Sequence, residues 1–191
     1  MQRLSLCIDI DGTLTDPYYW LPRANEFFGR KIRPEEVTRY KNHEALGVEE
    51  KEYDEFYSIF GPKLHSEAEI RSGVYEVINE LYKTHYIHFV TAREEKMEFV
   101  SLDWLNKHQI PLDTISLLGS HDKVQRAGEL ESDIFIEDCY DNALQLAGAG
   151  FDVLLIDCSY NQGPVLPNIT RVYSWHQIKN IIVQRSEKEA S

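Results

Sequence analysis

The sequence predicts an α/β fold: a Rossmann-like core in which a parallel sheet is flanked by helices, carrying a small helical insertion. Short apolar segments of strand length alternate with amphipathic helical segments through most of the chain, an alternation typical of βαβ units. Residues 16–72 interrupt it with charged and aromatic residues and no strand pattern. At 191 residues, the chain has room for one domain with a modest insertion.

The core elements are predicted from apolar runs and helical spacing. The predicted strands are residues 4–8, 86–90, 114–118, 134–136 and 153–156, and the helices between them are residues 74–82, 95–107 and 142–150. In the second helix, Phe99, Leu102 and Leu105 recur at helical spacing, so we expect them on its apolar face. The third helix ends at Gly150, a common helix C-cap.

The remaining segments complete the domain assignment. We assign residues 1–15 and 73–183 to the core, 16–72 to the helical insertion, and 184–191 to a polar tail that frays. Within the insertion, Pro34 suits the first turn of a helix. Residues 48–60 form a further candidate helix. Its aromatic residues recur at spacings of three and four, which favours the insertion's own core: Tyr53, Phe56, Tyr57 and Phe60.

The composition limits the range of partners. Acidic residues number 32 against 20 basic ones, for a formal net charge of −12, so the chain should repel polymeric nucleic acid. A small phosphorylated substrate remains compatible if local cations receive it. No apolar run approaches the ~18 residues of a membrane span, and the apolar start is too short for a signal peptide. Cys7, Cys139 and Cys158 form no CxxC pair, so we expect buried, reduced thiols in a cytoplasmic protein.

Two carboxylates follow the first predicted strand. Asp9 and Asp11 are separated by one residue and precede Gly12 and Thr13, which turn the chain. In an extended chain they point the same way, at a strand end where open α/β folds place ligands. Like charges at this distance favour a cation between them or a protonated carboxyl. The pair therefore indicates a Mg²⁺ site in which a carboxylate also attacks an electrophile. The alternative is a polar turn, because Asp-Gly is a common turn pair.

Three further signals lie near the ends of later strands. Thr91-Ala92-Arg93 offers a hydroxyl donor and a fixed cation for phosphate oxygens. Lys123 follows the third strand, and Glu137-Asp138, with Asp141 nearby, follows the fourth. Such acids could complete an oxygen ligand set for Mg²⁺. Each signal alone has a simpler explanation, because Thr and Asp often cap helices and most Lys and Arg side chains are solvated.

Taken together, these motifs resemble the haloacid dehalogenase (HAD) superfamily. The order is Asp-x-Asp-Gly-Thr, then Thr91, then Lys123, then the acidic pair, each after a predicted strand. A response-regulator receiver also groups acids, Thr and Lys around Mg²⁺. Its phosphorylated Asp belongs to a middle strand, however, whereas Asp9 and Asp11 follow the first. The insertion lies between the first two motifs, where HAD phosphatases of the C1 type carry their cap.

The resemblance implies a role for each matching residue. Asp9 would be the nucleophile that forms an aspartyl-phosphate, and Asp11 would protonate the leaving alcohol and then activate water. The implied Mg²⁺ ligands are Asp9, the backbone carbonyl of Asp11, and Asp138, with Glu137 or Asp141 in support. The implied phosphate-binding residues are Thr91, Ala92, Arg93 and Lys123.

The cap would hold the leaving group and exclude water. Tyr18, Tyr19 and Trp20 directly follow the nucleophile loop, so we expect at least one of them to face the substrate. Within the superfamily, the chain resembles the 5'(3')-deoxyribonucleotidase-like phosphatases and their bacterial relatives. The supporting stretches are Cys7-Ile8-Asp9-Ile10-Asp11-Gly12-Thr13, Phe89-Val90-Thr91-Ala92-Arg93 and Ile136-Glu137-Asp138-Cys139-Tyr140-Asp141-Asn142.

The predicted function is therefore Mg²⁺-dependent phosphomonoester hydrolysis through an aspartyl-phosphate, with a (deoxy)nucleoside monophosphate as substrate. Two alternatives remain: a phosphatase for a sugar phosphate or another small metabolite, and a catalytically silent HAD-fold binding protein. The aromatic-rich cap could also pack against a second subunit in a homodimer.

Overall fold

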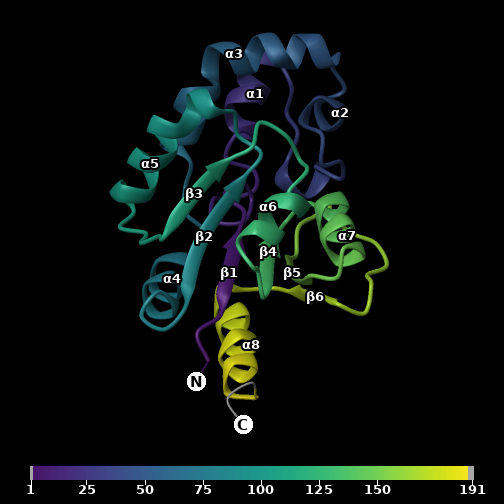
Figure 1. Cartoon of the computed structure of the whole chain (residues 1–191). Helices are drawn as coiled ribbons and strands as arrows, with labels where there is room; N and C mark the ends of the chain where they lie inside the picture. The colour runs from purple at the N-terminus through teal and green to yellow at the C-terminus, as the bar shows by residue number, and fades with distance from the viewer. Residues whose placement is uncertain (1, 189–191) are drawn as a thin grey trace.

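The computed structural model describes residues 2–188. This part of the chain forms a six-stranded parallel sheet in the order β3-β2-β1-β4-β5-β6, with helices on both faces and a helical cap at one end (Figure 1). The strands are β1 (Ser5–Ile8), β2 (Tyr86–Thr91), β3 (Thr114–Leu117), β4 (Ile134–Glu137), β5 (Asp152–Ile156) and β6 (Ile169–Val172). The parallel α/β fold is confirmed. β6 was not predicted, because a polar pair, Thr170 and Arg171, interrupts its apolar residues.

The helices follow the predicted pattern with several additions. They are α1 (Leu21–Phe28), α2 (Asn42–Leu46), α3 (Glu50–Glu67), α4 (Val74–Leu81), α5 (Glu98–Lys107), α6 (Val124–Glu129), α7 (Tyr140–Gly148) and α8 (Trp175–Lys188). Pro34 begins only a short 3-10 turn, Pro34–Glu36. α8 continues through part of the segment predicted to fray, and residues 189–191 of that segment lie outside the described residues. None of the described helices combines the length and apolarity needed to cross a bilayer.

Alternation along the strands divides the core between the two faces of the sheet. Leu6 and Ile8 of β1 pack in a cluster with apolar residues of α4, α5 and α8. Cys7 points to the opposite face and packs with residues of α6 and α7. Since successive strand residues face opposite sides, strands that are apolar throughout are buried on both. All three cysteines are free and buried.

The prediction for the apolar face of α5 is wrong. Phe99 is 84% exposed and Leu102 is 39% exposed. The buried face carries Ser101 and Trp104 in their place, together with the expected Leu105. The Trp104 indole N–H donates to the backbone carbonyl of Ala68 at 2.8 Å. This contact orients α5 by a polar partner distant in sequence, which a spacing argument does not include.

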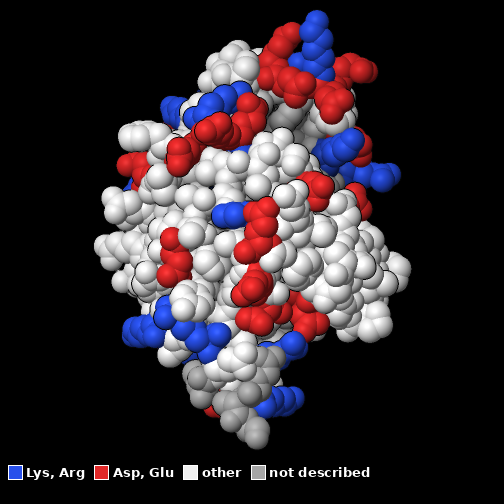
Figure 2. Space-filling view, viewed as in Figure 1, with Lys and Arg blue, Asp and Glu red and all other residues white. Residues whose placement is uncertain are grey.

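The cap consists of α1, α2 and α3 and sits beyond the carboxyl ends of the strands (Figure 1). Two linkers join it to the core, and they pair at an isolated bridge between Thr15 and Ile70. The cap has its own apolar cluster, centred on the fully buried Phe56. Figure 2 shows acidic side chains over the cap and down the middle of this face, with no continuous basic surface on the side in view.

The sheet topology places a crevice next to β1. From β1 the chain adds β2 and β3 on one side, then returns to add β4, β5 and β6 on the other. Ligands of open α/β sheets bind outside the carboxyl ends of the strands at such a switch point. The ends of β1 and β4 are adjacent here, since Ile8 pairs with Ile136.

Candidate active site

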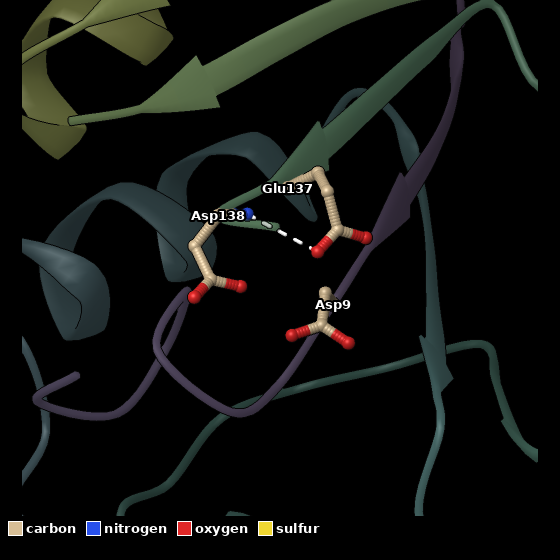
Figure 3. A group of neighbouring side chains, drawn as sticks. All are labelled: Asp9, Glu137 and Asp138. Atoms are coloured by element: carbon tan, nitrogen blue, oxygen red, sulfur yellow. Dashed lines mark hydrogen bonds between the residues drawn. The ribbon is translucent and has the colours of Figure 1, made fainter. Parts of the chain in front are cut away.

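Three carboxylates converge at the adjacent ends of β1 and β4. One carboxylate oxygen each from Asp9, Glu137 and Asp138 lies within 4.8 Å of the others, and Figure 3 shows the side chains directed toward a common point. All three are buried. Three acids at such a distance repel one another, so the cluster requires compensating positive charge.

Lys123 supplies part of that charge. Its ammonium donates to Asp9 Oδ1 at 2.5 Å and to Glu137 Oε2 at 2.8 Å. Burial opposes the charged form, but the two carboxylates outweigh it and raise the pKa of Lys123 above its ordinary value. The other Glu137 oxygen accepts the backbone N–H groups of Asp138 and Cys139, at 3.2 and 3.0 Å. Glu137 is therefore fully engaged in holding Lys123 and the start of α7.

Asp9 and Asp138 remain available to a metal. Burial, followed for Asp138 by the charge of Glu137, raises the pKa of both carboxyls. Asp138 accepts hydrogen bonds from the Tyr160 hydroxyl at 2.5 Å and from Thr13 Oγ1 at 3.3 Å. Buried oxygen donors whose charges are incompletely compensated suit a hard divalent cation such as Mg²⁺. The residues present thus fit the metal that the resemblance implies.

Gly12 allows the loop after β1 to lie close to the loop after β4, which carries Asp138. Its φ is +80°, which side-chain-bearing residues rarely adopt, and a Cβ at this position would lie 2.3 Å from Asp138 Oδ2. The backbone carbonyl of Gly12 accepts from Arg71 Nε at 2.7 Å. Arg71 lies in the second cap linker, so the nucleophile loop is tied to the junction between cap and core.

Asp11 is held apart from Asp9 by a different cation. Arg93 donates from Nε to Asp11 Oδ2 at 2.8 Å and from Nη2 to Oδ1 at 2.6 Å. Burial raises the pKa of Asp11, but the charge of Arg93 outweighs it and holds that pKa well below its ordinary value. A further Arg93 donor, Nη1, bonds to Ser101 Oγ at 2.8 Å. Arg93, predicted to bind phosphate, thus directs these three donors to protein groups.

Two of the other predicted phosphate ligands face the cavity. Thr91 and Ala92 follow from β2 and line a cavity of about 440 Å³ together with Asp9 and Asp11. Thr91 Oγ1 accepts the backbone N–H of Arg93 at 3.2 Å, which leaves its own O–H as a donor. Lys123, the remaining predicted phosphate ligand, is buried and bonded to Asp9, and it is not among the residues that line this cavity.

The cap supplies the remaining wall of the cavity. The cap residues that line it are Pro17, Tyr19, Trp20, Tyr40, Lys41, Asn42, His43, Glu50, Tyr53, Tyr57 and His65. Of the three aromatic residues singled out in the sequence, Tyr19 and Trp20 are in this set. Tyr18 lines a neighbouring cavity of about 700 Å³ and hydrogen-bonds with Ser159 at 2.6 Å. Asp141 is exposed in the first turn of α7 and does not line the cavity that contains Asp9 and Asp11.

Several residues of the site carry no sequence signal of their own. Tyr160, in the loop after β5, bonds to Asp138 and lines the cavity. His121, in the loop before α6, lines the cavity and packs edge-on against Tyr40 of the cap, with ring centroids 5.7 Å apart. His65 was one of seven scattered histidines and lies beside Asp11. The packing of the cap and of the loops over the sheet brings these residues together.

The fold is that of the haloacid dehalogenase-like hydrolases. A haloacid dehalogenase-like hydrolase of Streptococcus pneumoniae aligns with a TM-score of 0.70 at 15% identity, over 94% of this chain and 98% of that one. A HAD family hydrolase of Deinococcus radiodurans, solved with bound phosphate and sodium, aligns with a TM-score of 0.66 at 13% identity, over 95% and 96% of the two chains. At such identities the likeness establishes the fold.

The family follows from the sequence comparisons. The profile described as "5' nucleotidase, deoxy (Pyrimidine), cytosolic type C protein" matches residues 3–188. A nucleotidase of Clostridium acetobutylicum is 46% identical over 188 residues, which cover 98% of each chain. The chain belongs to this 5' nucleotidase family, a family of phosphoric monoester hydrolases. The predicted resemblance to HAD-type nucleotidases is confirmed.

Proposed function

We propose that the chain hydrolyses 5'-nucleoside monophosphates through an aspartyl-phosphate on Asp9, with Mg²⁺ bound by Asp9, the backbone carbonyl of Asp11, and Asp138. The observation that carries the proposal is the separate pairing of the two acids of the Asp-x-Asp motif. Asp9 is paired with Lys123 and Asp11 with Arg93. This difference in pairing supports different roles for the two carboxylates, nucleophile for Asp9 and acid and base for Asp11.

In the first half-reaction, a carboxylate oxygen of Asp9 attacks phosphorus. The bond between phosphorus and the leaving oxygen breaks, and that oxygen takes the proton carried by Asp11. Lys123 and the Thr91 hydroxyl hold the phosphoryl oxygens, and Lys123 offsets the charge of Asp9. Since Arg93 favours the charged form of Asp11, the negative charge of the arriving phosphate is what would favour its protonation.

In the second half-reaction, water attacks the phosphorus of the aspartyl-phosphate. Asp11, now a carboxylate, takes the proton from that water, and Asp9 is released with inorganic phosphate. The pairing with Arg93 keeps Asp11 in the carboxylate form, which is the form that can accept this proton. When bound, Mg²⁺ would neutralise charge on the transferring phosphoryl group and on the acids around it.

A nucleotide substrate is supported by the cap and by the relatives. The cavity wall above the acids carries aromatic side chains, including Trp20 and Tyr53, which suit a planar ring. The description of the matched family includes the words "deoxy (Pyrimidine)" and "cytosolic type C", which agree with a nucleotide substrate and with the expected cytoplasmic location. The alternative of a sugar phosphate phosphatase keeps the same chemistry and differs only in the group under the cap.

The test is phosphate release from a panel of deoxy- and ribonucleoside monophosphates, sugar phosphates and p-nitrophenyl phosphate. We expect preference for nucleotides, loss of activity with EDTA, recovery with Mg²⁺, and no turnover by Asp9→Asn. Preference for sugar phosphates would retain the mechanism and reject the substrate. No hydrolysis by folded, Mg²⁺-supplied protein would reject the enzymatic proposal in favour of a binding role.

A further inference from the structure

A chain of hydrogen bonds runs from the cap to the Asp11 carboxylate. The Tyr57 hydroxyl lies 2.7 Å from His65 Nε2, and His65 Nδ1 lies 3.0 Å from the Tyr19 hydroxyl. The Tyr19 hydroxyl donates to Asp11 Oδ1 at 3.0 Å. Tyr57 and His65 belong to α3 and Tyr19 to the loop before α1, so the chain consists entirely of cap residues until it reaches Asp11.

The hydrogen bonds of this series all donate in one direction, from Tyr57 toward Asp11. Because the Tyr19 O–H donates to Asp11, the Tyr19 oxygen accepts from His65, which places a hydrogen on His65 Nδ1. A neutral imidazole then presents Nε2 as an acceptor for the Tyr57 O–H. His65 is only 3% exposed, and this arrangement satisfies both ring nitrogens.

The local sequence of α3 makes room for this arrangement. Gly61 and Pro62 follow one another inside α3, between Tyr57 and His65. The Tyr57 ring lies over Gly61, where a Cβ would approach it to 3.2 Å. A side chain at this position would crowd the ring against its hydrogen-bond partner. The glycine thus permits the Tyr57 hydroxyl to reach His65.

The two oxygens of Asp11 differ in consequence. Oδ1 accepts from Arg93 Nη2 and from Tyr19, and His65 Nδ1 is 3.4 Å away. Oδ2 accepts from Arg93 Nε. A carboxylate oxygen has two lone pairs in its plane, so Oδ1 is saturated whereas Oδ2 retains one lone pair, and Asp11 lines the cavity.

We propose that the Tyr57–His65–Tyr19 chain positions Asp11, saturating Oδ1 so that Oδ2 is the atom that donates and accepts the proton in catalysis. The inference rests on the proposed function, in which Asp11 is the acid and base. The three cap residues act through Asp11 and are positioning residues. With the cap displaced, Arg93 alone would hold Asp11, and the carboxylate could rotate away from the leaving oxygen.

The kinetic test compares kcat/KM for phenyl phosphate and p-nitrophenyl phosphate, which are similar in shape but differ in leaving group. Phenolate needs protonation as it leaves, whereas p-nitrophenolate does not, and kcat/KM reports the half-reaction in which the bond breaks. We expect Tyr19→Phe to lower kcat/KM about tenfold more for phenyl phosphate than for p-nitrophenyl phosphate. Tyr57→Phe should skew the ratio in the same direction by a smaller factor.

The matched control is Tyr53→Phe. Tyr53 lies on the same helix and lines the same cavity, but its hydroxyl accepts from Asn42 Nδ2 at 2.7 Å and does not join the chain. We expect its ratio between the two substrates to equal that of the unaltered protein. Equal losses for both substrates in Tyr19→Phe would overturn the proposal, as would the same skew in Tyr53→Phe.

Asp11→Asn separates this proposal from the proposed function. If it skews the ratio and Tyr19→Phe does not, Asp11 is the acid and only the positioning chain is rejected. If the unaltered protein with Mg²⁺ hydrolyses neither the aryl phosphates nor any nucleotide of the panel, both proposals fail.

A direct measurement needs no turnover. In ¹⁵N-labelled histidine spectra of the metal-free protein, we expect His65 in the Nδ1–H tautomer, with the Nε2 signal shifted in Tyr57→Phe. A Nε2–H tautomer, or a doubly protonated ring, would contradict the direction of the chain.

Discussion

At the scale of single residues, charge compensation organises this site. Lys123 is buried between two carboxylates and Arg93 grips a third. Removing one partner of a buried pair leaves an uncompensated charge, which costs more than the pair contributes. We therefore expect each cation to affect both the stability of the protein and the reactivity of its acid.

We predict that Lys123→Met destabilises the metal-free protein by roughly 3–5 kcal/mol and abolishes turnover. Adding Glu137→Gln removes one of the uncompensated carboxylates, so the double variant should regain part of the stability and none of the activity. Urea unfolding near neutral pH and phosphate release measure the two effects. A double variant as unstable as the single one would show that charge compensation is not the cause.

The second residue-scale prediction concerns Gly12. Gly12 and Gly47 both have positive φ, +80° and +63°, but nothing lies within 4 Å of a Cβ at Gly47. Gly47→Ala should cost about 1–2 kcal/mol for the backbone alone. Gly12→Ala should cost more and also displace Asp138, so kcat should fall sharply in that variant only. Equal effects on kcat would contradict the close approach of the two loops.

At the scale of elements, the cap depends on an aromatic cluster that is separate from the core of the sheet. Phe56 is fully buried at its centre, with ring centroids of Phe27, Phe28, Tyr53 and Phe60 at 5.2–5.6 Å. The stripe predicted on α3 does form this cluster, with the exception of Tyr57, which faces the cavity. One helix thus serves packing on one side and the site on the other.

We predict that Phe56→Ala destabilises the cap by about 3–5 kcal/mol. Amide hydrogen exchange should quicken in α1 and α3 while the strands of the sheet stay protected. Phe27→Ala is the control, because Phe27 belongs to the same cluster but is 48% exposed, so its effect should be less than half as large. Equal acceleration in the sheet would mean that cap and core unfold together.

At the scale of the whole molecule, the topology determines where function lies. The switch point between β1 and β4 brings Asp9 next to Asp138, residues far apart in the chain. The repulsion between these buried acids lowers the free energy of unfolding of the whole molecule. Binding of a cation to the folded state alone would therefore stabilise the entire molecule.

We predict that Mg²⁺ raises the free energy of unfolding, by about 2.7 kcal/mol at a hundredfold excess over its Kd. Asp138→Asn should lose most of this gain, and its metal-free form should be at least as stable as the unaltered protein, because one crowded charge is gone. Asp141→Asn should retain most of the gain, since Asp141 is exposed. Thermal unfolding with and without Mg²⁺ measures this. An opposite ranking of the two variants would transfer the metal to Asp141.

The sequence by itself determined the parallel α/β core, the strand-end acids and the family, because these depend on local patterns. An apolar run predicts a strand, and in a parallel sheet the residues that follow such strands all lie at the carboxyl ends of the strands. Five of the six strands among residues 2–188 were predicted in this way.

Only the tertiary structure decided which groups meet. Arg93 lies 82 positions from Asp11, and Tyr160 lies 22 positions from Asp138, so no periodicity links them. The same holds for the buried face of α5, which is oriented by the bond from Trp104 to Ala68. Such contacts depend on how the cap and loops pack over the sheet. Packing is a property of the whole chain and is not encoded in any local pattern.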